Sequence, residues 1–144
     1  GSDPGGNGFE SHQDAQAGWN AYAGNFVTVM VCIDAAAVEN GCLEVAPGQH
    51  RRGLLRGMEP LTEDDMVGMA FRPVPTEPGD LVMFDAYVPH RSQPNMTGNM
   101  RRMYFATYNR ASEGDHMAQY YADKRESYPP DIEREPGREY VYKV

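Results

Sequence analysis

Three potential metal ligands constrain how this chain can fold. His12 and Asp14 lie two positions apart in the segment His12-Gln13-Asp14, and His90 lies far downstream. Because side chains two positions apart share one face of a β-strand, His12 and Asp14 are predicted to point at a common centre while Gln13 points away. Two imidazoles and one carboxylate form the facial triad typical of non-haem Fe(II) sites. The fold must therefore place a strand that ends at His90 beside this segment.

Short apolar segments bounded by turn residues recur along the chain. They are rich in β-branched and aromatic residues, and the expected strands cover residues 26–34, 42–46, 69–74, 81–86 and 101–108. Two helices are expected, one over residues 59–66 with Thr62 as N-cap and one over residues 111–127 with Ser112 or Asp115 as N-cap. This spacing favours an all-β antiparallel sandwich or barrel with minor helices.

Composition limits the function classes. The chain has 144 residues and a formal net charge of −8, and its 13 Lys and Arg residues form no long basic stripe, so nucleic acid is not expected as a partner. No apolar segment approaches the roughly twenty residues that span a bilayer, and no signal-peptide pattern opens the chain, so a cytoplasmic protein without membrane attachment is expected. Cys32 and Cys42 are too few for a disulfide scaffold and are expected to be free, buried thiols.

Three separated segments together resemble one known family. They are His12-Gln13-Asp14, the stretch ENGCLEVAPGQH at residues 39–50, and the region from His90 to the run RRMYFATY that Arg101 opens. In this order and spacing they resemble the phytanoyl-CoA dioxygenase family of Fe(II)/2-oxoglutarate-dependent oxygenases, over residues 8–109. The resemblance implies a double-stranded β-helix, which is a jelly-roll or cupin-like barrel, with the metal inside one barrel mouth.

The resemblance also implies roles for individual residues. His12, Asp14 and His90 would bind Fe(II). Arg101 would bind the distal carboxylate of 2-oxoglutarate, and Ser92 would contact the same carboxylate. The implied reaction consumes 2-oxoglutarate and O2, hydroxylates a small-molecule substrate, and releases succinate and CO2. The carboxylate in the triad favours hydroxylation over halogenation, because related halogenating enzymes have a small residue at that position.

Residues that could contact the substrate have two interpretations each. Trp19 and Tyr22 follow the metal segment, and they would form either a substrate lid or ordinary aromatic packing. Arg51 would either meet an anionic substrate or lie in solvent as a surface arginine. Family members act on several substrate classes, so the sequence does not identify the substrate.

The chain is expected to have three parts. These are a flexible Gly-rich lead-in at residues 1–8, a catalytic barrel core at residues 9–110, and a C-terminal helix with an extended tail at residues 111–144 that packs on the core. Because family members carry the first barrel strand before the H-x-D motif, the chain is expected to be a fragment that lacks this N-terminal part. The sheet edge exposed in such a fragment would favour self-association.

Two other function classes remain open. A zinc-dependent hydrolase could use the same His/Asp/His set with a metal-bound water, and dependence of turnover on iron and 2-oxoglutarate distinguishes the two. A non-catalytic or truncated barrel that only binds ligands is the second alternative. Consumption of 2-oxoglutarate distinguishes this binding module from the oxygenase.

Overall fold

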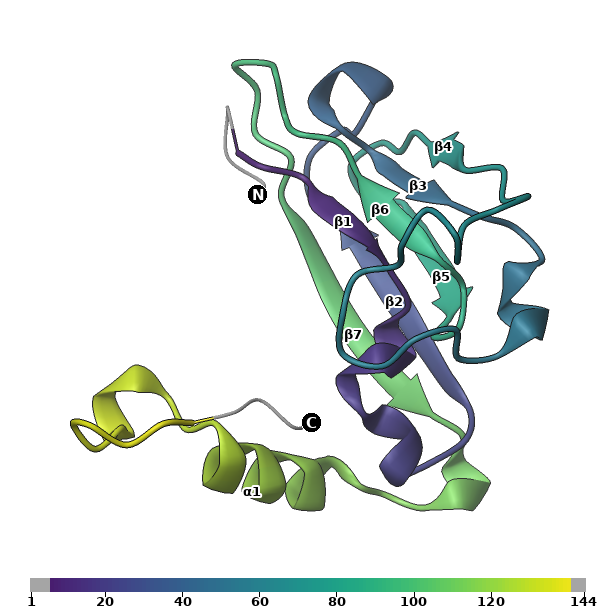
Figure 1. Ribbon diagram of the computed structural model, residues 1–144. Coiled ribbons are helices and arrows are strands. Elements are labelled where there is room, and N and C mark those ends of the chain that lie inside the picture. Colours follow the sequence, from purple (N-terminus) through teal and green to yellow (C-terminus); the bar gives the residue numbers. More distant parts are fainter. Residues whose placement is uncertain (1–5, 141–144) are drawn as a thin grey trace.

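The computed structural model describes residues 6–140 and contains two antiparallel β-sheets (Figure 1). One sheet has the strand order β1-β6-β3-β4 and the other the order β5-β2-β7. The strands are β1 (Phe9–His12), β2 (Phe26–Cys32), β3 (Leu43–Val45), β4 (Arg72–Val74), β5 (Leu81–Asp85), β6 (His90–Ser92) and β7 (Met103–Asn109). The expected all-β class with minor helices is confirmed. Expectations for residues 1–5 and 141–144 lie outside the described residues.

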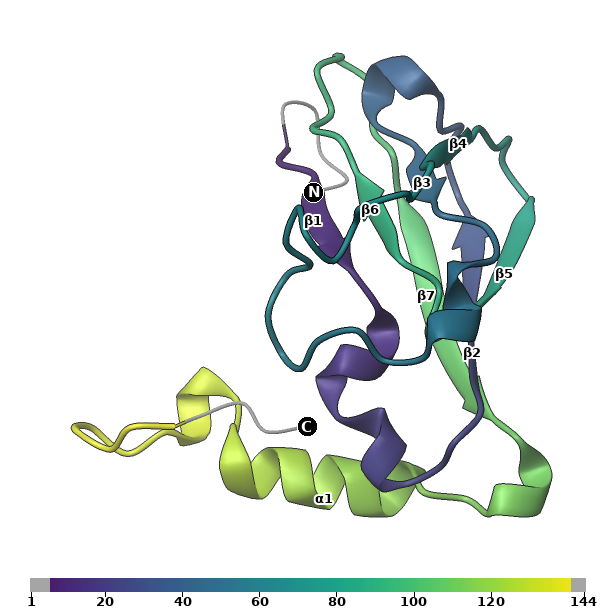
Figure 2. The ribbon, with the colours of Figure 1, turned by 45° about the vertical axis from the view of Figure 1, so that its right-hand side comes forward.

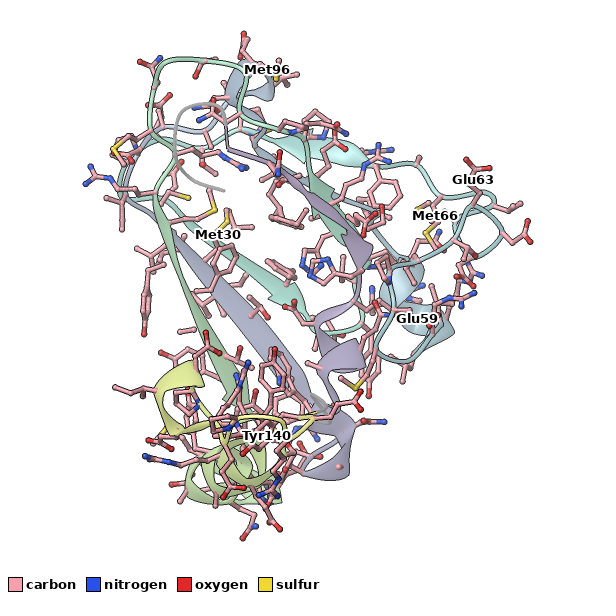
Figure 3. All side chains as sticks on the ribbon, turned by 60° about the vertical axis from the view of Figure 1, so that its left-hand side comes forward. Met30, Glu59, Glu63, Met66, Met96 and Tyr140 are labelled. Carbon is pink, nitrogen blue, oxygen red and sulfur yellow. The ribbon has the colours of Figure 1, made fainter. Side chains whose placement is uncertain are left out.

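The core lies between the two sheets, because each sheet contributes alternate side chains to it. In β2 the buried positions are Thr28, Met30 and Cys32, which is the two-residue period expected for a strand with one interior face. Figure 3 shows Met30 projecting from β2 into the space between the sheets. Leu43 of β3 and Phe84 of β5 belong to the same apolar cluster. Each such buried side chain contributes about 1.5–3 kcal/mol relative to an exposed one.

Both cysteines are free and buried, as expected. Cys32 ends β2 and belongs to the core cluster, and Cys42 lies just before β3. Burial raises the pKa of the Cys42 thiol. Both side chains pack as small apolar groups, and Cys42 is held as a thiol rather than a reactive thiolate.

The helix expected over residues 59–66 is not formed. The segment contains a bend and turns, because the single turn that begins at Thr62 ends at Gly68. The Asp65 carboxylate accepts hydrogen bonds from the backbone N–H and the hydroxyl of Thr62, each at 2.8 Å, and the Thr62 hydroxyl accepts from the Asp65 N–H at 3.3 Å. These bonds complete one turn, and Gly68, with φ of 76°, then redirects the chain.

The helical region expected over residues 111–127 is divided into two elements. A short 3-10 helix, η5 (Ala111–Glu113), is separated from α1 (Met117–Ser127) by Gly114, whose φ is 95°. The Asp115 carboxylate accepts a hydrogen bond from the Met117 N–H at 3.0 Å, as a capping residue does. Figures 1 and 2 show α1 below the sheets and to the left of the lower ends of β2 and β7.

The remaining elements are short. They are the 3-10 helices η1 (Asp14–Ala17), η2 (Trp19–Ala21), η3 (Val38–Asn40), η4 (Gln49–Arg52) and η6 (Asp131–Glu133). Among residues 6–140, no helix combines the length and apolar character that a membrane crossing requires. The elements η1 and η2 matter most for function, because they connect the metal motif to β2.

Candidate metal centre

His12, Asp14 and His90 converge on one point. His12 ends β1 and lies opposite His90, the first residue of β6, in an antiparallel pair. Their ligand atoms and a carboxylate oxygen of Asp14 all lie within 4.8 Å of one another. Asp14 Oδ1 is 3.4 Å from Nε2 of His90 and 3.7 Å from Nε2 of His12. One ion could contact all three groups, as the sequence predicted.

Two local details of this prediction were wrong. The strand ends at His12, so Asp14 belongs to η1 rather than to β1. The two side chains still lie on one side because Gln13 has extended dihedral angles, with φ of −116° and ψ of 135°. His90 begins β6 rather than ending the preceding strand, β5, which stops at Asp85. The intervening loop turns the chain toward the other sheet.

Backbone carbonyls orient both imidazoles. Nδ1 of His12 lies 2.8 Å from the carbonyl oxygen of Glu10, and Nδ1 of His90 lies 3.0 Å from that of Val88. Since a carbonyl can only accept, each Nδ1 carries the proton and donates it. Each Nε2 therefore presents its lone pair toward Asp14, which is the arrangement that metal-binding histidines use.

The protonation states also suit a cation. Burial lowers the pKa of His12, and the nearby imidazole of His90 lowers it further. Burial by itself would raise the pKa of Asp14, but the contacts of its carboxylate with the His90 imidazole and the Thr28 hydroxyl outweigh burial and hold that pKa below its usual value. Near neutral pH the centre thus offers a neutral imidazole from His12 and an ionised carboxylate. This donor set fits Fe(II).

Thr28 of β2 is a contact that the sequence did not reveal. Its buried hydroxyl donates a hydrogen bond to Asp14 Oδ2. This bond connects the second sheet to the metal motif and fixes the carboxylate so that Oδ1 faces the two imidazoles. Only the fold reveals the contact, because Thr28 and Asp14 belong to different elements and threonine is common in strands.

Replacing Thr28 with valine is expected to lower the affinity for Fe(II) by about tenfold to a hundredfold, because loss of a group that orients a metal ligand has this effect. Fe(II) binding would be measured anaerobically by calorimetry. Thr107→Val is the matched control, since Thr107 pairs with Thr28 in the neighbouring strand β7. Equal losses in the two variants would contradict the role assigned to Thr28.

Gln13, the residue between two ligands, is fully buried, and its side-chain amide hydrogen-bonds to two loops. Its Nε2 donates to the carbonyls of Gly53 at 2.8 Å and Tyr87 at 2.7 Å, and its Oε1 accepts from the N–H of Leu55 at 2.8 Å. Gln13 thereby joins the H-x-D motif to the loop that follows η4 and to the loop that precedes His90. The sequence signal, an amide side chain between two ligands, is too common to identify this role.

Gln16 of η1 extends the same attachment. Its Nε2 donates to the carbonyls of Gly57 at 3.2 Å and Glu59 at 2.6 Å, and its Oε1 accepts from the Gln13 N–H at 2.7 Å. Figure 3 marks Glu59 on this loop. The loop at residues 53–59 is therefore fixed against the metal motif by two glutamines.

Replacing Gln13 with leucine is expected to lower the free energy of unfolding by on the order of 3 kcal/mol, because buried backbone groups lose their partners. Urea denaturation followed by circular dichroism measures this difference. Gln119→Leu on α1 is the control, since Gln119 is exposed and its Nε2 donates to Asp123 at 2.6 Å. A Gln13→Leu protein as stable as this control would show that the Gln13 hydrogen bonds do not contribute to the free energy of unfolding.

Arg101 is buried and Arg102 is exposed, as predicted, although both precede β7, which begins at Met103 rather than at Arg101. Arg101 is 3% exposed, and its guanidinium donates to the carbonyl of Gly41. It lies two residues before Met103, which opposes buried Cys32, so it continues the inner face of β7. Arg102 is exposed and its Nε donates to Asp34 at 2.8 Å. Burial lowers the pKa of Arg101, so an anion bound beside it would offset its loss of hydration.

Ser92 lies on the inner face of β6. It is buried, as is His90 two positions earlier, while Arg91 between them contacts Glu44 on the other side. The Ser92 hydroxyl oxygen accepts a hydrogen bond from the Phe9 N–H at 3.3 Å. The residue thus shares the metal ligand's side of the sheet.

One cavity is lined by the H-x-D motif, and a second cleft shares Trp19 with it. A cavity of about 410 Å³ is lined by His12, Asp14 and Trp19, among others. A cleft of about 430 Å³ is lined by Trp19 and Tyr22 together with residues of β7 and α1. Arg51 lies exposed in η4 and lines neither of these cavities, so it is not brought to the site.

Two solved structures of other proteins are similar to this chain. The crystal structure of EctD from S. alaskensis with 2-oxoglutarate and 5-hydroxyectoine matches with a TM-score of 0.68 and 26% identity, covering 78% of this chain and 42% of that chain. AviO1 from Streptomyces viridochromogenes matches with a TM-score of 0.62 and 27% identity, covering 79% of this chain and 49% of that chain. The expected double-stranded β-helix is therefore confirmed.

Fold and ligand set together define a barrel of the non-haem iron oxygenase class. The family model of phytanoyl-CoA dioxygenase matches residues 2–103. The chain belongs to the phytanoyl-CoA dioxygenase family.

Two relatives extend the similarity beyond the family pattern. A 2-aminoethylphosphonate dioxygenase of the uncultured bacterium HF130_AEPn_1 is 44% identical over 140 residues, which are 95% of this chain and 53% of the relative. A methylphosphonate hydroxylase of Gimesia maris is 42% identical over 131 residues, which are 87% of this chain and 48% of the relative. The chain spans about half the length of these relatives.

Proposed function

We propose that this chain carries the catalytic centre of an Fe(II)- and 2-oxoglutarate-dependent dioxygenase that hydroxylates a small molecule. The observation that carries the proposal is the convergence of His12, Asp14 and His90 with both imidazoles oriented by backbone carbonyls. The division into a core at residues 9–110 and a C-terminal part from residue 111 is part of the same proposal. Self-association stays a prediction, with β7 at a sheet edge as the surface involved.

The metal ligands, Arg101 and Ser92 would have different roles in this reaction. His12, Asp14 and His90 would hold the iron on one face and leave its other positions to ligands. When bound, iron supplies the oxidative decarboxylation of 2-oxoglutarate by O2, with transfer of one oxygen atom to a substrate C–H bond. Arg101 would bind the distal carboxylate of 2-oxoglutarate by a charge-assisted contact, with Ser92 donating its hydroxyl proton to the same group. The buried position of both residues supports these assignments.

For the substrate, we propose a small organic phosphonate. Support comes from the two relatives, whose names specify 2-aminoethylphosphonate and methylphosphonate. The same three ligands would hold the iron for any phosphonate substrate. The side chains beside the metal would determine which phosphonate is oriented for reaction.

Succinate release tests the proposed reaction. The full chain would be incubated in air with Fe(II), 2-oxoglutarate and 2-aminoethylphosphonate or methylphosphonate, and succinate and hydroxylated product would be quantified by mass spectrometry. We expect equimolar succinate and product, with none when Zn(II) replaces Fe(II). Activity with Zn(II) and without 2-oxoglutarate would favour the hydrolase, and 2-oxoglutarate binding without consumption would favour the binding module.

A further inference from the structure

Gly41 lies beside the chain that follows β6. This strand lies between β1 and β3 in its sheet (Figure 1), and Ser92, its last residue, pairs with Leu43 of β3. Gly41 lies two residues before Leu43 and comes close to the backbone of Gln93, the residue after Ser92. A Cβ atom added to Gly41 would overlap the carbonyl group of Gln93. The close approach of the two segments therefore requires a glycine.

The turn at Gly41 is fixed by hydrogen bonds. Gly41 ends η3 in the left-handed region, with φ of 75° and ψ of 51°. The buried Asn40 side chain accepts from the Ala37 N–H at 2.7 Å and donates to the Ala35 carbonyl at 3.0 Å. The Cys42 N–H donates to the Ala37 carbonyl at 2.9 Å. Because this N–H and the Gly41 carbonyl belong to one planar peptide group, the direction of the Gly41 carbonyl is fixed as well.

The Gly41 carbonyl accepts a hydrogen bond from the buried Arg101 guanidinium. Arg101 and Ser92 are the two residues proposed to bind the distal carboxylate of 2-oxoglutarate, and they lie in different segments of the chain. Gly41 contacts Arg101 through its carbonyl and comes close to the residue that follows Ser92. One turn therefore determines how these two side chains are placed relative to each other.

We infer that Gly41 is a positioning residue for the cosubstrate: its carbonyl orients the Arg101 guanidinium, and its lack of a side chain lets Ser92 lie close to that group. The inference rests on the proposed function for the roles of Arg101 and Ser92. A side chain at position 41 would push the turn away from Gln93, so that one carboxylate could no longer contact both groups. The loss would affect the distal end of 2-oxoglutarate and not the end that chelates the metal.

Two 2-oxo acids separate this role from a general loss of structure. 2-Oxopentanoate has a methyl group where 2-oxoglutarate has its distal carboxylate, and both acids present the same 2-oxo acid group to the metal. The affinity of the full chain for each acid would be measured by anaerobic calorimetry in the presence of Fe(II). We call the ratio of the two dissociation constants the carboxylate preference, and we expect it to be about thirtyfold or more in the wild type.

Gly41→Ala is expected to reduce the carboxylate preference about tenfold to a hundredfold and to leave the affinity for Fe(II) unchanged. Gly48→Ala is the matched control, because Gly48 also has a positive φ, 81°, and an added Cβ there meets no described atom within 4 Å. Both variants place alanine in left-handed backbone, so the difference between them reports the overlap with Gln93. An equal carboxylate preference in the two variants would overturn the inference.

Asn40→Ala disturbs the same turn without adding an atom. It takes the place of Gly41→Ala if that variant lacks the circular dichroism spectrum of the wild type. Asn40→Ala is expected to reduce the carboxylate preference about two- to tenfold, because the turn loses two hydrogen bonds. Asn109→Ala is its control, since the Asn109 side chain likewise donates to two backbone carbonyls, those of Arg110 and Gly114. The same carboxylate preference in both asparagine variants would then overturn the inference.

Failure of the inference and failure of the proposed function give different results. If Arg101→Ala lowers the carboxylate preference and the variant at the Gly41 turn retains it, the cosubstrate role of Arg101 stands and the inference is rejected. A wild-type chain that binds both acids equally would contradict the roles of Arg101 and Ser92, and the inference would be rejected with them.

Discussion

Asp14→Ala is expected to lower the affinity for Fe(II) more than about a hundredfold and to abolish 2-oxoglutarate consumption. The substitution removes the one carboxylate of the ligand set and leaves only two imidazoles to hold the ion. Losing a group that merely orients a ligand already costs tenfold to a hundredfold, so losing the ligand should cost more. It also removes the acceptor for the Thr28 hydroxyl.

Calorimetric titration with Fe(II) under anaerobic, chloride-free conditions measures this effect. Chloride is left out because a halide could enter the position that the carboxylate vacates. Asp34→Ala serves as the control, since Asp34 binds Arg102 on the outside of the barrel. Retained Fe(II) affinity in Asp14→Ala would place the metal elsewhere.

Arg101→Ala is expected to weaken 2-oxoglutarate binding far more than Arg102→Ala. Removing one partner of a buried charge pair costs on the order of 2–5 kcal/mol, or about thirtyfold to several thousandfold. Arg102 forms an exposed pair with Asp34, and such a pair contributes about 0–1 kcal/mol. The inner and outer positions of the two side chains therefore predict unequal effects.

Anaerobic titration of the Fe(II)-loaded variants with 2-oxoglutarate measures both affinities. Because the Arg101 guanidinium also donates to the carbonyl of Gly41, unfolding temperatures must be recorded in parallel. Arg101→Lys retains the charge without the bidentate geometry and should bind with intermediate affinity. Equal losses in Arg101→Ala and Arg102→Ala would remove the cosubstrate role from Arg101.

Strand alternation explains why much of this barrel could be predicted. The two-residue period places Thr28, Met30 and Cys32 inside, and it separates Arg101 from Arg102. Spacing in the H-x-D motif likewise brings two ligands to one side, even though Asp14 belongs to a 3-10 helix. These features depend on local geometry, which a single sequence specifies well.

Contacts between distant segments could not be predicted in this way. The Gln13 amide bonds to three loop groups that become neighbours only in the folded chain. The turn at Thr62 and Asp65 shows the opposite problem, because the side-chain bonds of a helix start are present there, yet the chain turns away at Gly68 before a helix forms. Tyr22 and Asp123 meet across the cleft with no signal in either local sequence.

Absorption spectroscopy of the anaerobic Fe(II) complex tests the central claim most directly. Three protein ligands on one face leave adjacent positions through which 2-oxoglutarate can chelate the metal. The full chain with Fe(II) is therefore predicted to develop a weak visible charge-transfer band on addition of 2-oxoglutarate, and Asp14→Ala is predicted to lack it. A wild-type protein that binds Fe(II) and stays colourless at saturating 2-oxoglutarate would contradict the assignment of His12, Asp14 and His90 as an oxygenase centre.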